Sequence, residues 1–323
     1  MKTLSNIRWE IPKCNLCASN EFIVVFEGVR YWENDLSFRI VKCKKCNLVF
    51  LNPRPQKKYI KMFYKTDSYW GRDLISKKTL GNYQKEREKS YGKIYDLIPD
   101  KKGKILDIGA GIGLFLSKFK EEGWDVEGVE YSKEASNYAL IQFGIKIQSR
   151  DFLEKKIINK FDVVTMNNVL EHLYKPLETL IKVNKTLKDD GFLIIAVPNL
   201  DSLGFKIFGK NWYPLQPPIH LYHFTPITIN KMLKKAGFVK INITYPNWKH
   251  NYFSLFESFR SVFTKRNSTP VVIKAGGSSK KRQNMSFIKE AGIVSGRIFA
   301  HFFSFLGSKT KQGESIIIYA KKK

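Results

Sequence analysis

The spacing of apolar residues changes along the chain and predicts different elements in succession. A short apolar run at residues 104–108 predicts a buried strand, and apolar positions at helical spacing over residues 113–120 predict a helix. Residues 125–130 predict a second strand. A strand, a glycine-rich turn, a helix and another strand in this order are typical of an α/β nucleotide-binding unit.

Similar patterns flank this unit. Residues 22–26 and 38–41 predict two strands that fold back on each other. Farther along, two apolar stripes at helical spacing predict amphipathic helices: Tyr252, Leu255, Phe256, Phe259 and Phe263, then Val294, Ile298, Phe302, Phe305 and Leu306. Two such helices, joined by the cationic loop 264–282, can rest on an anionic bilayer. The alternative is that their apolar faces cover the sheet or a dimer partner.

Composition narrows the class of protein. The chain has 323 residues, 43% of them hydrophobic and 14% aromatic, so it has room for about two domains and a real core. It contains no apolar run of about 18 residues, so no membrane span is predicted, and its first residues lack a signal core, which favours a cytoplasmic location. The formal net charge of +27 attracts nucleic acid, anionic lipid headgroups or phosphorylated substrates, unless the lysines form only a solvated surface.

The four cysteines form two pairs, Cys14 with Cys17 and Cys43 with Cys46. In a reducing compartment such pairs favour a metal over disulfides, and together they supply the four thiolates of tetrahedral Zn²⁺. Four protein ligands leave no open coordination position, so the predicted site is structural. A catalytic dithiol would explain one pair and not two. Residues 39–65 carry many Lys and Arg and no acidic residue, which suits an anionic partner or a solvated face.

The glycine-rich turn after residue 108 indicates the type of ligand. Its glycines let the backbone turn tightly and approach a ligand, and Glu130 at the end of the next strand can accept the ribose hydroxyls of a nucleoside. Position 114, where a dinucleotide-binding loop needs glycine, is Leu114. Asp107 suits a cationic amino acid group better than a pyrophosphate. S-adenosylmethionine has these properties.

Several segments resemble motifs of class I S-adenosylmethionine-dependent methyltransferases. They are 105–115 for the first motif, 126–132 for the acidic second motif, 150–152 for the loop after the third strand, 161–173 for the fourth strand with its Leu-Glu-His turn, and 192–199 for the fifth strand. The resemblance implies cofactor contacts from Asp107, Gly109, Ala110, Gly111, Gly113, Glu130, Tyr131, Asp151, Phe152 and Asn167. It also implies that Asp151 contacts the adenine amino group and Phe152 packs on the ring. Asn168 departs from the pattern, because relatives often carry Asp there.

The resemblance further implies the fold. This is α/β, a Rossmann-like, seven-stranded, doubly wound sheet with a small N-terminal zinc ribbon, in which residues 238–245 form the sixth strand and residues 314–320 an antiparallel seventh. The expected divisions are the zinc-ribbon module 1–52, a helical linker or cap 53–99, the S-adenosylmethionine-binding core 100–245, the amphipathic basic insertion 246–313, and the final strand and tail 314–323. Tyr69, Trp70 and Tyr83 of the linker are expected to pack or to form a lid over the cofactor.

Histidines are the candidates for the chemistry. Methyl transfer to a hydroxyl needs a base, and histidine is well suited near neutral pH. His172 follows the fourth strand, and His220 and His223 lie in a segment that, with residues 51–55, resembles a zinc-ribbon subgroup associated with sugar, polysaccharide or other small-molecule modification. The alternatives are supporting roles: the start of a helix for His172, and hydrogen bonds that fix the loop for the other two. A metal site made from two histidines alone is not expected.

The sequence therefore predicts an S-adenosylmethionine-dependent methyltransferase that acts on a small-molecule or glycan-precursor acceptor, with oxygen favoured as the acceptor atom. The alternatives are an RNA methyltransferase that binds RNA through the basic zinc module, and a non-catalytic binding module. The expected cofactors are S-adenosylmethionine and structural Zn²⁺. The insertion adds the expectation of an anionic membrane surface as a partner, at the inner face of the membrane.

Overall fold

The computed structural model describes most of the chain. The described residues are 7–30, 36–64, 94–95, 97–98, 101–154, 160–246, 248–263 and 287–323. The predicted lid residues Tyr69, Trp70 and Tyr83, and the cationic loop between the two amphipathic helices, lie outside them.

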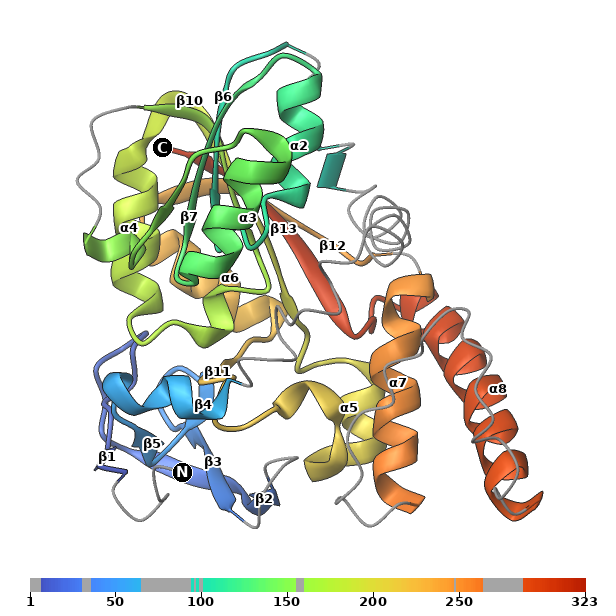
Figure 1. Ribbon diagram of the computed structural model, residues 1–323. Helices are drawn as coiled ribbons and strands as arrows, with labels where there is room; N and C mark the ends of the chain where they lie inside the picture. The colour runs from blue at the N-terminus through green and yellow to red at the C-terminus, as the bar shows by residue number, and fades with distance from the viewer. Residues whose placement is uncertain are drawn as a thin grey trace.

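A seven-stranded sheet forms the centre of the molecule, in the order β12-β13-β10-β9-β6-β7-β8 (Figure 1). Its strands are β6 (Lys104–Ile108), β7 (Asp125–Glu130), β8 (Ile147–Ser149), β9 (Phe161–Asn167), β10 (Leu187–Pro198), β12 (Phe238–Thr244) and β13 (Ser315–Lys322). Strands β6 to β10 run parallel, and β13 lies antiparallel between β10 and β12. The predicted sheet and its antiparallel seventh strand are therefore confirmed. Strand β10 begins earlier than predicted, with a bulge between Leu187 and Phe192.

Helices cover both faces of this sheet. They are α2 (Leu114–Glu121) and α3 (Lys133–Phe143) on one face, and α4 (Pro176–Thr186) and α6 (Pro226–Lys235) on the other. Neighbouring strand residues separate these two faces: Ile105 and Val163 pack on the α2 side, whereas Leu106 and Val164 pack on the α4 side. A strand that is covered on both faces must be apolar on both, which explains why the central strands are mainly apolar runs and do not alternate with polar residues.

The N-terminal segment forms a second, smaller sheet in the order β11-β4-β3-β2. Its strands are β2 (Phe22–Arg30), β3 (Ser37–Cys43), β4 (Val49–Leu51) and β11 (Tyr222–His223), and β1 (Trp9–Glu10) pairs separately with β5 (Arg54–Pro55). The predicted hairpin of two strands is thus confirmed. Strand β11 comes from the chain after β10, so a segment predicted as part of the core completes the ribbon. Ile40 and Phe50 of the ribbon share one hydrophobic cluster with Leu180 and Phe224 of the core.

The insertion between β12 and β13 consists of α7 (Trp248–Phe263) and α8 (Phe287–Lys309), which pack against each other beside the short helix α5 (Leu203–Phe208) (Figure 1). Leu255 and Phe256 of the first predicted stripe are buried. The second stripe, on α8, instead faces solvent. The expectation that it covers the sheet is therefore wrong. No helix among the described residues is long and apolar enough to cross a membrane.

Glu314, next to β13, is a buried acid that ties this strand to the start of α5 and to the loop after α5. Its carboxylate accepts hydrogen bonds from the Trp212 indole N–H (2.5 Å) and the Gly204 backbone N–H (2.9 Å). Burial raises the pKa of Glu314 to about 7, although these hydrogen bonds lower it. The folded state therefore holds a proton that the unfolded chain releases near pH 4.5.

We expect this proton to make stability fall as the pH rises from about 4.5 to about 7, by on the order of 3 kcal/mol. In a Glu314→Gln variant the melting temperature is expected to decline less between pH 5 and pH 8 than in the wild type. The variant is also expected to be less stable at pH 5, because the amide NH₂ would face another donor. Thermal melts at several pH values measure both effects. An equally steep decline in the variant would contradict this role.

Candidate functional site

The glycine loop follows β6 and begins α2. Gly109, Gly111 and Gly113 all have positive φ, where L side chains are disfavoured. A Cβ at Gly109 would lie 2.4 Å from Val169 Cγ2, so glycine is needed for space as well. The N–H groups of Gly109 and Ala110 both donate to the carbonyl of Val129 (2.7 and 3.1 Å), which ties the loop to the end of β7.

Glu130, the last residue of β7, organises this loop. Its Oε2 accepts a hydrogen bond from Gly111 N–H (2.9 Å), and its Oε1 accepts from Tyr131 N–H (2.7 Å) and Ser132 N–H (2.9 Å). A carboxylate has about four acceptor positions, so it retains capacity for a ligand hydroxyl. On the neighbouring strand Asp107 is buried, and its carboxylate accepts a hydrogen bond from the Thr165 hydroxyl (2.7 Å).

A short 3₁₀ helix after the ribbon, η2 (Lys57–Phe63), lies against the same edge. Its Lys57 forms an ion pair with Asp151, and its Lys61 ammonium lies 4.5 Å from the centre of the Tyr131 ring. Burial alone would raise the pKa of Asp151, but the hydrogen bonds from Lys57 and the Leu153 N–H hold it below its usual value. These two lysines belong to the segment predicted as a cationic face, so part of that charge is used within the protein.

Phe152 and Asn167 complete the predicted cofactor residues. Phe152 is buried in the shared core, with the Lys182 ammonium 5.1 Å from its ring centre. Asn167 ends β9, and both polar atoms of its buried amide lack a hydrogen-bond partner among the described residues. An unpaired buried amide is costly, which suits a group that bonds a ligand. All ten predicted residues lie at or just beyond the carboxyl ends of the adjacent strands β9, β6, β7 and β8, where ligands of open α/β sheets bind.

Three titratable side chains gather beside this edge. Glu171 and His172 lie in η5 (Leu170–His172), directly after β9, and His220 precedes β11. The two imidazole rings are perpendicular, with centroids 4.6 Å apart. His172 Nδ1 lies 2.9 Å from the carbonyl of Ile219, and His220 Nδ1 lies 2.7 Å from that of Pro214. A carbonyl only accepts, so Nδ1 carries the proton in each ring and Nε2 has a free lone pair.

Burial keeps this cluster uncharged near neutral pH. Glu171 is 1% exposed, and neither carboxylate oxygen has a hydrogen-bond partner in the part of the chain that the structure describes. Burial raises the pKa of Glu171 to about 8, lowers that of His172 to about 4 and lowers that of His220 well below its ordinary value. The ligand atoms of the three lie within 4.8 Å of one another, so they can also hold a cation. Sequence reasoning considered histidines alone and missed Glu171, although it directly precedes His172.

His223 lies in a different setting. It belongs to β11 and pairs with Val49 of β4, so its side chain is buried where the ribbon meets the core. Its Nε2 has no partner among the described residues, and burial lowers its pKa to about 3. Of the three predicted histidines, the structure brings the rings of His172 and His220 into contact.

The four cysteines also converge. Their sulfur atoms lie within 4.8 Å of one another, with Cys14 to Cys46 and Cys17 to Cys43 each 3.4 Å apart. Thiolates on one tetrahedral Zn²⁺ are separated by about 3.8 Å, so the arrangement fits such an ion. Each cysteine pair forms the same kind of backbone turn. In the first turn the N–H of Ala18 donates to the carbonyl of Cys14, and in the second the N–H of Asn47 donates to the carbonyl of Cys43. Ala18 and Asn47 both have positive φ.

Contacts with two helices fix this cluster on the core. Asn15 Oδ1 accepts a hydrogen bond from the N–H of Leu177 in α4 (2.9 Å), and Lys235 of α6 donates to the carbonyl of Leu16 (2.7 Å). The ribbon is therefore held against α4 and α6, the two helices that cover one face of the sheet.

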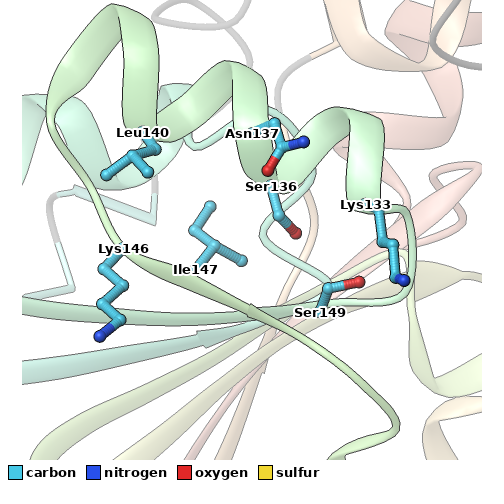
Figure 2. Close-up of a pocket in the computed structure, with 7 residues that line it drawn as sticks. All are labelled: Lys133, Ser136, Asn137, Leu140, Lys146, Ile147 and Ser149. Atoms are coloured by element: carbon cyan, nitrogen blue, oxygen red, sulfur yellow. The ribbon is translucent and has the colours of Figure 1, made fainter.

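A separate pocket lies between α3 and the outermost strand β8 (Figure 2). It is lined by Lys133, Ser136, Asn137, Leu140, Lys146, Ile147 and Ser149. None of these residues belongs to the glycine loop or to the Glu171 cluster, so the candidate site is defined by those elements and not by this pocket.

The strand order, with an antiparallel β13 between β10 and β12, and a glycine loop bound to an acid at the end of β7 define a class I, Rossmann-like methyltransferase fold. A family model described as a methyltransferase domain matches residues 83–243. The ubiquinone biosynthesis O-methyltransferase of Pelagibacter ubique is 30% identical over 172 residues, which are 47% of this chain and 70% of that protein. The chain belongs to the S-adenosylmethionine-dependent methyltransferase family.

Other relatives are matched over less of their length. The enzymes of the same name from Maricaulis maris and Glaesserella parasuis are each 32% identical, and the chain spans 58% and 49% of them, respectively, while 42% and 32% of this chain is covered. Among solved structures, a methyltransferase from Archaeoglobus fulgidus is 22% identical with a TM-score of 0.46, covering 73% of this chain and 94% of that one. One from Listeria monocytogenes is 16% identical with a TM-score of 0.48, covering 73% and 99%.

Proposed function

We propose that this protein transfers the methyl group of S-adenosylmethionine to a hydroxyl of a small molecule or glycan precursor. The observation that carries the proposal is the cluster of Glu171, His172 and His220 at the carboxyl end of β9, in which the centroids of the two imidazole rings lie 4.6 Å apart. The relatives whose names specify an O-methyltransferase support oxygen as the acceptor atom.

The cofactor edge supplies the binding groups. S-adenosylmethionine provides an electrophilic methyl group on a sulfonium. In this proposal Glu130 accepts the ribose hydroxyls, Asp107 faces the cationic amino acid end, and Asp151 with Phe152 contacts the adenine. Because Glu130 already fixes the glycine loop through Gly111, the loop is organised before the ligand arrives.

The histidines supply the base. A neutral imidazole with a free Nε2 lone pair can accept the acceptor's proton as the oxygen attacks the methyl group. Glu171 Oε1 lies 4.0 Å from His172 Nε2, so an ionised Glu171 would stabilise the imidazolium that forms. The two neutral imidazoles also suit a divalent cation if Glu171 loses its proton and binds as a carboxylate. Metal analysis of the purified protein tests whether a cation is bound there.

A structural Zn²⁺ in the Cys14, Cys17, Cys43 and Cys46 cluster is part of the same proposal. Its thiolates would hold the ribbon folded, and the ribbon in turn places Lys57 and Tyr64 at the active edge. The Tyr64 hydroxyl lies 3.3 Å from His172 Nδ1. The RNA alternative is weakened because Arg54 is buried against Glu10 (2.6 Å) and Lys57 pairs with Asp151, so neither cation is available to phosphates.

The test is a kinetic comparison. We expect His220→Ala to lower methyl transfer to a panel of phenolic and nucleotide-sugar hydroxyl compounds by about a hundredfold or more, with S-adenosylmethionine affinity changed by less than about twofold. His223→Ala is tested in parallel, and His301→Ala, on α8, is the control. Unchanged turnover in both variants would remove these histidines from the site. RNA binding that weakens steeply with salt, with no small-molecule turnover, would favour the RNA alternative.

A further inference from the structure

Helix α8 turns apolar side chains toward solvent. Val294, Ile298, Phe302, Phe305 and Leu306, here called the α8 stripe, are each between 37% and 65% exposed. Their spacing of four, four, three and one residues places them on one face of the helix. Five neighbouring large apolar side chains on one helix exceed the scattered exposed residues that are ordinary on a protein surface.

The opposite face of α8 holds the helix in this orientation. Gly296 and Ala300 are buried against α7, and a Cβ at Gly296 would lie 2.8 Å from a ring carbon of Phe259. The rings of Phe259 and Phe299 are 5.2 Å apart. Figure 1 shows α7 between α5 and α8, with α8 as the outermost of the three. The stripe cannot rotate inward without losing this close packing.

Charge selects the kind of surface that the stripe fits. Arg297, Lys309 and Lys311, on the described part of α8 and the turn after it, are exposed. Glu257, on the neighbouring helix α7, is buried and paired with Arg260 (2.8 Å). Arg297 is exposed beside the stripe, and the Lys309 ammonium lies 5.7 Å from the Phe305 ring centre at its end. A second copy of the chain would bring the same positive charge to this face, whereas an anionic bilayer offers negative headgroups above an apolar interior.

We propose that the α8 stripe inserts into the surface of an anionic lipid bilayer, with α8 lying in the plane of the interface. The aromatic and aliphatic side chains enter the boundary between headgroups and acyl chains, and Arg297 and Lys309 remain at headgroup level. This role is independent of the methyl acceptor, because no residue of the stripe belongs to the cofactor edge.

The test is cosedimentation of the full chain with vesicles of phosphatidylcholine alone and of phosphatidylcholine mixed with phosphatidylglycerol. We expect pelleting with the anionic vesicles that weakens as salt is raised, and little with the neutral ones. The double substitution Ile298→Ser with Phe302→Ser is expected to weaken this binding at least about tenfold. The matched control removes two isoleucines of other helices that are at least as exposed, Ile141→Ser with Ile227→Ser, and should bind as the wild type does.

Other outcomes overturn the proposal. These are no pelleting of the wild type, or equal loss in the stripe variant and its control. A dimer in sedimentation velocity that only the stripe variant abolishes would assign the stripe to self-association instead. A Phe302→Trp variant gives a second readout that does not depend on a loss of binding: its fluorescence should be quenched by brominated lipids, and absence of quenching while the protein is bound would place α8 away from the bilayer.

Discussion

Replacing Glu130 by alanine is expected to weaken S-adenosylmethionine binding at least about a hundredfold. The substitution removes the acceptor for the N–H groups of Gly111, Tyr131 and Ser132 and also the proposed acceptor for the ribose. Hydrogen bonds to a charged group contribute about 1.5–3 kcal/mol each, and about 2.8 kcal/mol corresponds to a hundredfold change in affinity. The loop would lose its fixed geometry before the ligand binds, so the loss comes from both contact and organisation.

Isothermal titration calorimetry measures this effect. The matched control is Glu127→Ala on the same strand, because Glu127 pairs with Lys104 (2.9 Å), which lies at the opposite end of β6 from the glycine loop. The control is expected to keep the wild-type affinity within about twofold. Asp107→Ala should also weaken binding, since the Asp107 carboxylate is fixed by Thr165 at the adjacent strand end. Wild-type affinity in both Glu130→Ala and Asp107→Ala would refute the cofactor site.

Removing the proposed Zn²⁺ from the cysteine cluster is expected to have the second largest effect, on the stability of the protein. Structural zinc in small modules contributes about 10–16 kcal/mol of apparent binding free energy, comparable with the entire stability of a typical domain. The ribbon shares a hydrophobic cluster with the core, so its unfolding should expose Ile40 and Phe50 and lower the melting temperature by roughly 10 °C or more. Affinity for S-adenosylmethionine should fall as well, because η2 and its contacts with Asp151 and Tyr131 follow the ribbon directly.

The measurement combines metal analysis by mass spectrometry with thermal melts before and after chelation. One zinc per chain is expected, and Cys43→Ser should lose it. Lys45→Ala is the control, because Lys45 lies inside the second pair and is largely exposed. A Cys43→Ser protein that retains both its zinc and its melting temperature would show that the four thiols do not form one site.

The features that the sequence predicted are those encoded by neighbouring residues. Strand β6 is a short, mainly apolar run, the glycine loop stands directly between β6 and α2, and each cysteine pair spans only four residues. Local residue spacing is sufficient to predict such elements, because a strand or helix must bury one or both of its faces whichever segment it packs against.

The features that the sequence missed depend on contacts between distant segments. Lys57 meets Asp151 and Tyr64 meets His172 across about a hundred residues, and no local pattern indicates either contact. The Glu171 side chain is buried by several segments at once, and its oxygens have no hydrogen-bond partner among the described residues, which no local pattern could predict. On α8 the apolar stripe was predicted to be the face that packs against the rest of the protein. The face that packs against α7 instead carries Gly296 and Ala300, because these small residues let α7 approach closely.

Strand β4 pairs with β11, which the ribosome makes much later in the chain. Tyr222 pairs with Phe50, and the N–H of Leu51 donates to the carbonyl of Leu221 (2.9 Å), so the fourth strand of the ribbon is made long after the first three. Until the ribosome has passed residue 223, the backbone of β4 presents an open strand edge, the kind of edge that recruits foreign strands. A fragment ending at Pro55, after β4 and β5, would keep that edge permanently, because the segment that covers it, β11, would never be made.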